Sequence, residues 1–272
     1  MKFSYPLVTP EADAKIFAFQ KGSEFEQNLA AIADIGYDGV ELMVRDASLL
    51  NADELKAMIH RHGLEIAAVG TSPMPSQDKL TLGSEDADVR RRALERGLDA
   101  ADLAGALGVP LCIGKFRGSV SQGDNSLDAL ADSFKKICQR AAQRGTTVML
   151  EPQNKTNVNN LNTITESLEW VEKTGCSNLG LLMDTYHMDI TEKSMIGSII
   201  KGVSKTGFVH LSDNERYAVG AGRLQFMDIL SAFDASGYKG WYSVEVKQAP
   251  DSKTAAAVSF ACLDYIRSEL KL

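Results

Sequence analysis

Four side chains that could bind a metal ion each follow a short apolar run of the chain. They are Glu151 after TTVML, Asp184 after LGLLM, His210 after GFV and Glu245 after WYSV. Each run is typical of a buried β-strand, and a carboxylate at the end of such a strand is costly unless a cation or a proton compensates its charge. On neighbouring parallel strands, the three carboxylates and one imidazole would surround a single point. This ligand set suits a hard divalent ion, with Mn²⁺ as the first choice and Co²⁺ or Mg²⁺ as alternatives.

Two further residues could act on a ligand held at that point. His187 lies three residues after Asp184, which places it on the loop above the pocket, as a partner of a substrate hydroxyl group or a packing histidine. Arg216 closes the run HLSDNER, and its guanidinium could either donate to substrate oxygens or remain a surface charge. Asp213 in the same run is expected to brace a neighbouring group.

Further basic residues follow the predicted strands, and any that line the pocket would favour an anionic substrate. They are Arg45, Lys115, Arg117, Lys155, Arg223 and Lys247. His60 and His62 stand at the end of a predicted helix, before the next strand. They are therefore expected at the opposite end of the molecule from the four candidate ligands.

Strand-like and helix-like segments alternate along the whole chain. The predicted strands are Phe3–Val8, Gly39–Val44, Glu65–Val69, Val109–Gly114, Thr146–Leu150, Leu179–Met183, Thr206–His210 and Gly240–Val246. The predicted helices are Glu24–Ile35, Ala52–Arg61, Asp86–Leu107, Ser126–Arg144, Thr163–Thr174, Glu192–Val203, Gln225–Ala235 and Ser252–Leu270. Glycines follow most of the helices, and Thr163 with Glu166 resembles a capping box.

This alternation predicts a single α/β domain over residues 1–272, folded as a (β/α)8 TIM barrel. A chain of 272 residues has the usual size for this fold. A doubly wound open sheet is the alternative, but no Gly-x-Gly-x-x-Gly turn follows an early strand. Active sites of such barrels lie at the C-terminal ends of the strands, where the four candidate ligands would follow strands five to eight.

Composition limits the partners and the location. The net charge of −7 argues against a nucleic-acid or anionic membrane surface as the main partner. The four cysteines are widely spaced, without a Cys-x-x-Cys pair, which is typical of core residues in a reducing compartment. We expect no signal peptide at the N-terminus and no membrane span, and therefore a cytoplasmic protein.

Several segments resemble the xylose-isomerase-like TIM-barrel superfamily of sugar isomerases and epimerases, over nearly the whole chain. The nearest groups are the ketose 3-epimerases and the 5-keto-L-gluconate epimerases, and Val44-Arg-Asp with Ala68-Val-Gly-Thr resembles the latter. The segments are Gly36-Tyr-Asp-Gly-Val-Glu-Leu, Leu150-Glu-Pro-Gln-Asn, Met183-Asp-Thr-Tyr-His-Met, Val209-His-Leu-Ser-Asp-Asn-Glu-Arg and Gly237-Tyr-Lys-Gly-Trp-Tyr-Ser-Val-Glu.

The resemblance implies a role for each candidate residue. The residues that match the family's metal ligands are Glu151, Asp184, His210 and Glu245. Glu151 and Glu245 match its acid/base pair, and His187 and Arg216 match its substrate contacts. The ketose 3-epimerases usually carry a second glutamate six residues after the first, whereas this chain has Asn157 there. The family also implies a dimer or tetramer.

The expected function is therefore a divalent-metal-dependent epimerase or isomerase of a small keto-sugar or keto-sugar acid. It would act through a metal-stabilised enediolate, with two glutamates that move protons. A lyase or dehydratase of a keto-sugar would share this enediolate and remains an alternative. An AP-endonuclease-like phosphodiesterase would need more histidines than the four present. A non-catalytic sugar-binding module would not need the metal ligands.

Overall fold

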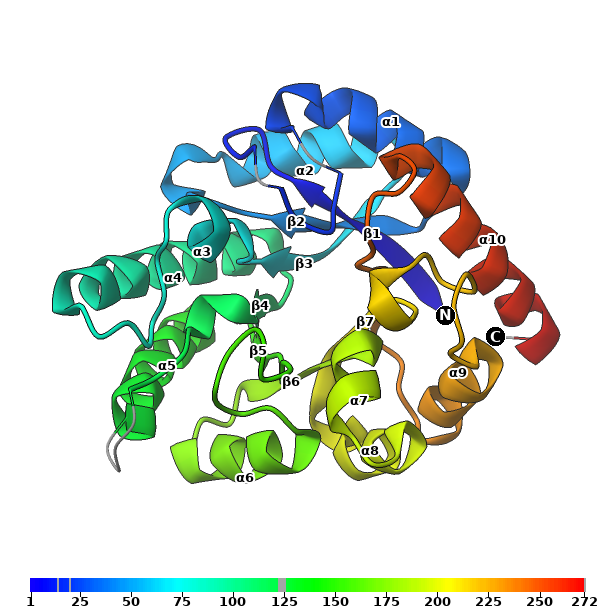
Figure 1. Ribbon diagram of the computed structural model, residues 1–272. Coiled ribbons are helices and arrows are strands. Elements are labelled where there is room, and N and C mark those ends of the chain that lie inside the picture. Colours follow the sequence, from blue (N-terminus) through cyan, green and yellow to red (C-terminus); the bar gives the residue numbers. More distant parts are fainter. Residues whose placement is uncertain (14, 20, 122–125, 272) are drawn as a thin grey trace.

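The computed structural model describes residues 1–13, 15–19, 21–121 and 126–271. Within them, eight parallel strands close a barrel in chain order, and β1 pairs with both β2 and β8. The predicted (β/α)8 barrel is confirmed, with the strands at the centre and the helices around them (Figure 1). The strands are β1 (Lys2–Val8), β2 (Gly39–Met43), β3 (Glu65–Gly70), β4 (Leu111–Ile113), β5 (Val148–Leu150), β6 (Leu179–Asp184), β7 (Thr206–Leu211) and β8 (Trp241–Val244).

The eight predicted helices are present, with ends that differ by at most three residues. They are α1 (Phe25–Ile35), α2 (Ala52–Arg61), α4 (Ala87–Leu107), α5 (Ser126–Gln143), α6 (Ile164–Thr174), α8 (Met195–Gly202), α9 (Phe226–Ala235) and α10 (Ser252–Leu270). The predicted capping box is confirmed, because Thr163 and Glu166 exchange hydrogen bonds at the start of α6. α8 begins three residues later than predicted, because the Ser194 side chain caps it by accepting from Gly197 N–H.

Two short helices were not predicted. They are α3 (Pro73–Gln77) and α7 (Thr185–Thr191), which follow β3 and β6. Each has seven residues or fewer, which is too short to show helical periodicity in the sequence. Both are at the C-terminal end of the barrel, and α7 contributes a residue to the site described below.

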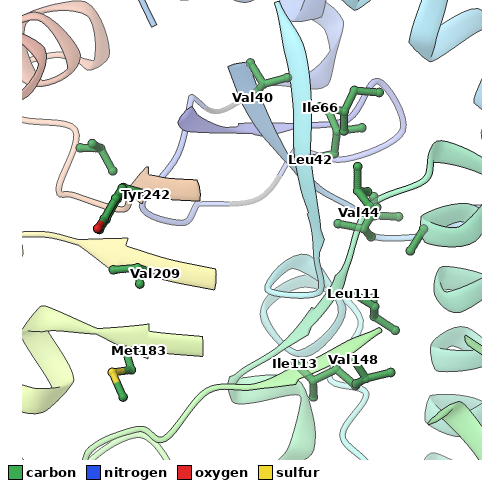
Figure 2. Packing of buried hydrophobic residues seen from close by; sticks show 14 of the residues in the cluster. Val40, Leu42, Val44, Ile66, Leu111, Ile113, Val148, Met183, Val209 and Tyr242 are labelled. Carbon is green, nitrogen blue, oxygen red and sulfur yellow. The ribbon is translucent and has the colours of Figure 1, made fainter. Parts of the chain in front are cut away.

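Apolar side chains on the outside of the strands pack against the helices. Leu111 on β4 and Val148 on β5 are completely buried in this layer (Figure 2). Along β6, Leu181 and Met183 belong to the same outer core. Side chains of a strand alternate between its two faces, so the residues between them face the barrel interior.

A smaller apolar cluster fills the lower part of the interior. Its members are Ala67, Ala68, Cys112, Met149, Leu182 and Phe208. Above this cluster, toward the C-terminal ends of the strands, the interior side chains become polar. The cluster therefore forms a buried apolar layer directly beneath the site.

Candidate metal centre

The four predicted ligands lie at the C-terminal ends of β5 to β8, two of them within a strand and two directly after one. We call them the four-residue centre. They are Glu151, Asp184, His210 and Glu245. Leu182 on β6 faces the interior, and Asp184 stands two residues later on the same face. Phe208 and His210 have the same relation on β7. The period of two thus points these side chains to the same place, and β6 and β7 align them in register.

The side chains of the centre converge closely. His210 Nδ1 lies 3.6 Å from Glu151 Oε1 and 3.7 Å from Asp184 Oδ2. It also lies 3.6 Å from Glu245 Oε2. One potential ligand atom from each of the four residues lies within 4.8 Å of the other three, and all four residues are buried. A single ion could therefore contact all four.

Two of these atoms, Glu151 Oε1 and His210 Nδ1, are buried and have no hydrogen-bond partner. A third, Asp184 Oδ2, makes no hydrogen bond but has an ion-pair contact with Arg216 Nη1 at 2.7 Å. The other carboxylate oxygens of the two acids are engaged. Asp184 Oδ1 caps α7 by accepting from Tyr186 N–H at 2.8 Å, and Glu151 Oε2 accepts from Gln153 Nε2. Buried acceptors without donors are costly. A divalent cation would satisfy all three, and their oxygen and imidazole chemistry suits one.

Glu41 on β2 holds His210 in place and was missed in the sequence. Its Oε2 lies 3.0 Å from His210 Nε2 and accepts from Ser243 Oγ at 2.7 Å. Its carboxylate is completely buried, so Nε2 carries a proton toward it, and Nδ1 is the ring atom that faces the centre. The signal was present in the sequence, because Glu41 is a carboxylate inside the apolar run GVELM.

Burial and neighbouring charges shift the pKa values of the centre in opposite directions. Burial raises the pKa of Glu245 to about 7, although Arg216 opposes this shift. Burial works in the same direction on Asp184, but Arg216 and His187 outweigh it and hold the pKa of that carboxyl well below its ordinary value. Burial lowers the pKa of His210, but Glu41 and Glu245 outweigh it and raise that pKa well above normal. Without an ion, the carboxyl group of Glu245 therefore holds a proton more readily than that of Asp184.

His187 is placed in α7, so the prediction that it lies on a loop was wrong. The Asp184 side chain starts this helix directly after β6, which leaves no loop between them. The Nδ1 atom of His187 faces Asn154 Nδ2 at 2.9 Å. The amide of Asn154 is oriented by Thr156, whose N–H donates to Asn154 Oδ1 at 3.0 Å. Nδ1 is therefore an acceptor and Nε2–H points into the site, and burial lowers the pKa of His187 to about 4.

Arg216 lies beside the centre on a strained turn. Glu215 and Arg216 have φ values of 57° and 59°, a left-handed conformation that costs about 1–3 kcal/mol for each residue. Asp213 stabilises the turn by accepting from three backbone N–H groups, and its predicted bracing role is confirmed. The guanidinium lies 5.1 Å from the ring centre of Phe17 and 4.6 Å from that of Tyr186.

The same guanidinium contacts both acids of the centre that lie nearest to it. Its Nη1 lies 2.7 Å from Asp184 Oδ2 and 2.9 Å from Glu245 Oε2. Its Nη2 lies 3.2 Å from His187 Nε2. Since both of these nitrogens carry protons, they form a pair of donors that could bind one oxygen of a ligand.

Gly114, which follows β4, allows Glu151 to take its position. A Cβ atom at residue 114 would lie 2.0 Å from Glu151 Oε2, closer than any side chain permits. Gln153 donates to that oxygen, and Asn157 Nδ2 donates to Gln153 Oε1 at 3.3 Å. Asn157 thus orients the amide that holds Glu151, in the position where a second glutamate was expected.

Arg117 is one of the predicted basic residues, and it is completely buried beside the centre. Its guanidinium donates to the backbone oxygens of Glu151 at 2.6 Å, Asn160 at 3.1 Å and Leu161 at 3.2 Å. It has no carboxylate partner within 4 Å in the described part of the chain, and burial lowers its pKa to about 10. Arg117 therefore fixes the backbone that follows β5 and does not face a ligand.

A cavity of about 640 Å³ opens above the centre, and Arg216 and Glu245 form part of its lining. Two of the predicted basic residues, Lys115 and Lys247, also line it. Three others are not among its lining residues: Arg45, which pairs with Asp78, Arg223, which pairs with Asp189, and Lys155. The cavity has the size of a small-molecule site.

The remaining predictions concern residues outside the site. His60 is in α2 and His62 ends that helix, directly before β3, at the opposite end of the barrel as predicted. The four cysteines are all free. Among the described helices, none combines the length and the apolar character that a membrane crossing requires.

Comparison with known proteins places this chain in a family. The family model described as "Xylose isomerase-like TIM barrel" matches residues 29–266. The chain is 30% identical over 229 residues to the L-ribulose 3-epimerase of Mesorhizobium japonicum. This match covers 82% of this chain and 75% of the relative. It is also 30% identical over 247 residues to the 3-dehydro-D-guloside 4-epimerase of Escherichia coli. This match covers 85% of this chain and 91% of the relative.

Solved structures share the fold. The apo form of the 3-keto-D-glucoside 4-epimerase from E. coli matches with a TM-score of 0.79 at 22% identity, over 98% of this chain and 99% of that chain. A structure of an L-ribulose 3-epimerase matches with a TM-score of 0.80 at 24% identity, over 100% and 97%.

Proposed function

Because the chain belongs to the xylose isomerase-like TIM barrel family, we propose that it is a metal-dependent sugar epimerase or isomerase. The ion, with Mn²⁺ as the first candidate, is held by the four-residue centre. The observation that carries this proposal is the convergence of buried ligand atoms from four residues, of which Glu151 Oε1 and His210 Nδ1 have no hydrogen-bond partner. Two relatives, an L-ribulose 3-epimerase and a 3-dehydro-D-guloside 4-epimerase, favour epimerisation of a keto-sugar.

The bound ion would supply Lewis-acid chemistry, which makes the hydrogen on the carbon next to a carbonyl more acidic. The residues of the chain move the proton. Gln153 donates to Glu151 Oε2 and so fixes the carboxylate, and Glu151 takes up the proton from carbon. Glu245, on a different strand of the centre, delivers a proton to the other face of the sugar. This exchange inverts the carbon.

Two further residues orient the sugar. His187 Nε2–H and Arg216 Nη2 point to one place and donate to the same substrate oxygen. The rings of Phe17 and Tyr186 both pack against the guanidinium, which limits its motion during the reaction. A fixed pair of donors stabilises negative charge that develops on that oxygen.

The test is turnover in D₂O, followed by NMR over ketohexoses, ketopentoses, keto-acids and their phosphates, with Mn²⁺ present. We expect deuterium at the inverted carbon, bound metal in the isolated protein and loss of turnover with EDTA. Glu151→Gln and Glu245→Gln are the controls for the acid/base pair. Turnover that survives full metal removal would refute the metal-dependent mechanism, and inversion without deuterium uptake would count against two bases.

The alternatives make different predictions in the same experiment. A lyase or dehydratase would form a product that has lost water or another group, which NMR detects directly. A phosphodiesterase with several metal ions would need more imidazole ligands near the centre. Of the four histidines, His210 belongs to the centre and His187 lies beside it, whereas His60 and His62 are at the other end of the barrel. The site thus favours sugar chemistry.

A further inference from the structure

Three lysines stand around the cavity above the four-residue centre. Lys15 follows β1, Lys115 follows β4 and Lys247 follows β8, so they approach the cavity from different sides of the barrel. All three side chains are exposed. Together with Arg216, they give the cavity lining four cationic residues against one acid, Glu245. This local excess contrasts with the net charge of −7 of the whole chain.

The three lysines have no acidic partners. In the described part of the chain, no carboxylate oxygen lies within 4 Å of the ammonium group of Lys15, Lys115 or Lys247. Some other exposed lysines are paired, as Lys2 is with Glu65 and Lys239 with Asp234. The nearest specific contact of Lys247 is the ring of Tyr217, 5.3 Å from its Nζ. Their charges are therefore available to a ligand.

The four-residue centre does not need these charges. A divalent ion held there would balance two of its three carboxylates, and Arg216, which contacts Asp184 and Glu245 directly, balances the third. Asn157, which also lines the cavity, is neutral. The lysines thus form a separate cationic rim, defined here as Lys15, Lys115 and Lys247, above a centre whose charge is already compensated.

We propose that the cationic rim binds an anionic group of the substrate, so that the substrate is a keto-sugar with a carboxylate or a phosphate. This inference rests on the proposed function, because the keto end of the sugar is assigned to the four-residue centre. The anionic group then lies at the other end of the sugar, toward the mouth of the cavity. Ammonium groups on flexible stems can reach a carboxylate or a phosphate from several sides.

The test measures binding of sugars that cannot react. Sorbitol, gluconate and sorbitol 6-phosphate are titrated calorimetrically into the Mn²⁺-loaded protein and into the EDTA-treated protein. At low salt, we expect at least one of the two anionic compounds to bind about tenfold or more tightly than sorbitol, and the advantage to shrink as salt screens the rim. The tighter of gluconate and sorbitol 6-phosphate then identifies the anionic group.

Lysine substitutions assign the effect to the rim. Lys115→Met and Lys247→Met should each reduce the advantage of the anionic compound by about two- to fivefold, the range for exposed charge pairs. The matched control is Lys205→Met, since Lys205 is also exposed and lies at the other end of the barrel, directly before β7. This control should keep the full advantage.

Two results would overturn the inference. One is equal affinity for sorbitol and both anionic compounds. The other is a preference for anions that survives both substitutions, because it would belong to the bound metal or to Arg216. Neither result affects the proposed function, which is judged separately by deuterium exchange over the panel of neutral and anionic sugars.

Discussion

The two halves of the barrel contribute to the site in different ways. The half from β5 to β8 carries the whole four-residue centre, and its following segments carry His187 and Arg216. The half from β1 to β4 carries none of the four candidate ligands, but it supplies Glu41 behind the centre and Lys15 and Lys115 on the cavity wall. The candidate catalytic residues are thus concentrated in one half. The other half supports His210 through Glu41 and supplies two of the lysines proposed to select the substrate. Lys247 is the exception, since it follows β8.

A few buried contacts join the two halves of the barrel at the site. Glu41 on β2 orients His210 on β7. Gly114, after β4, leaves the space that Glu151 fills. Arg117, in the same segment, holds the backbone oxygen of Glu151. Four predictions separate the direct role of the second half from the supporting role of the first.

The largest effect is expected from the second half itself. Glu151→Gln cannot take up a proton, so the rate of deuterium exchange should fall by about 10²- to 10⁴-fold. The measurement is exchange by NMR, with the melting temperature as a check on folding. Glu172→Gln on the exposed face of α6 is the matched control and should change neither quantity. A normal rate for Glu151→Gln would remove the residue from the acid/base pair.

The next largest effect is expected from a substitution in the first half, at Gly114, that displaces Glu151 in the second half. Gly114→Ala places a Cβ atom 2.0 Å from Glu151 Oε2 and 2.6 Å from Gln153 Nε2, so the carboxylate must move. A displacement of this size should reduce the exchange rate by about 100-fold. Gly197→Ala, whose Cβ would find its nearest neighbour, Ser194 Oγ, at 3.2 Å, is the control. Equal rates for both variants would show that the position of Glu151 does not depend on β4.

Glu41→Gln tests the support that β2 gives to His210. An amide is a weaker acceptor for His210 Nε2–H and places a second donor beside Ser243, so Mn²⁺ affinity should fall by about 10- to 100-fold. Ser243→Ala should have a smaller effect in the same direction, because it removes only the second bond to Glu41. Titration of the metal-free protein with Mn²⁺ measures both. Unchanged affinity in Glu41→Gln would restrict the metal site to the second half.

The smallest effect is expected at Asn157, on the wall of the second half. Asn157→Ala loses one hydrogen bond of 3.3 Å to Gln153 and should slow exchange by about two- to fivefold. Asn157→Asp should slow it further, because an acceptor then faces Gln153 Oε1 and favours rotation of the amide away from Glu151. If the aspartate variant were as fast as the alanine variant, the orientation of Gln153 would be unimportant.

Much of the site could be predicted because its residues obey local rules. Glu151, Asp184, His210 and Glu245 each follow a buried strand, and parallel strands of a barrel bring such positions together. The same argument could have predicted Glu41, since it is a carboxylate within the apolar run of β2. It was missed because it stands in the middle of its strand and not at the end.

Other features depend on contacts between distant segments. The burial of Arg117 and the orientation of His187 by Asn154 join residues on different strands and loops, so no spacing in the chain encodes them. α7 was not predicted, because its start depends on the Asp184 side chain and not on an apolar period. A sequence pattern shows which face of a single helix or strand is apolar, whereas these features depend on contacts between two separate segments.

The sequence by itself determined the alternation of strands and helices, the barrel and the ligand set, because hydrophobic period and strand ends are properties of neighbouring residues. The tertiary structure alone decided which basic residues face the cavity, which carboxylate supports His210 and which atoms of the centre lack partners. The physical reason is that burial, charge balance and hydrogen-bond satisfaction are set by whatever surrounds a group in space. For Lys115 and Arg117, two residues apart, the structure puts one on the cavity wall and buries the other against backbone oxygens.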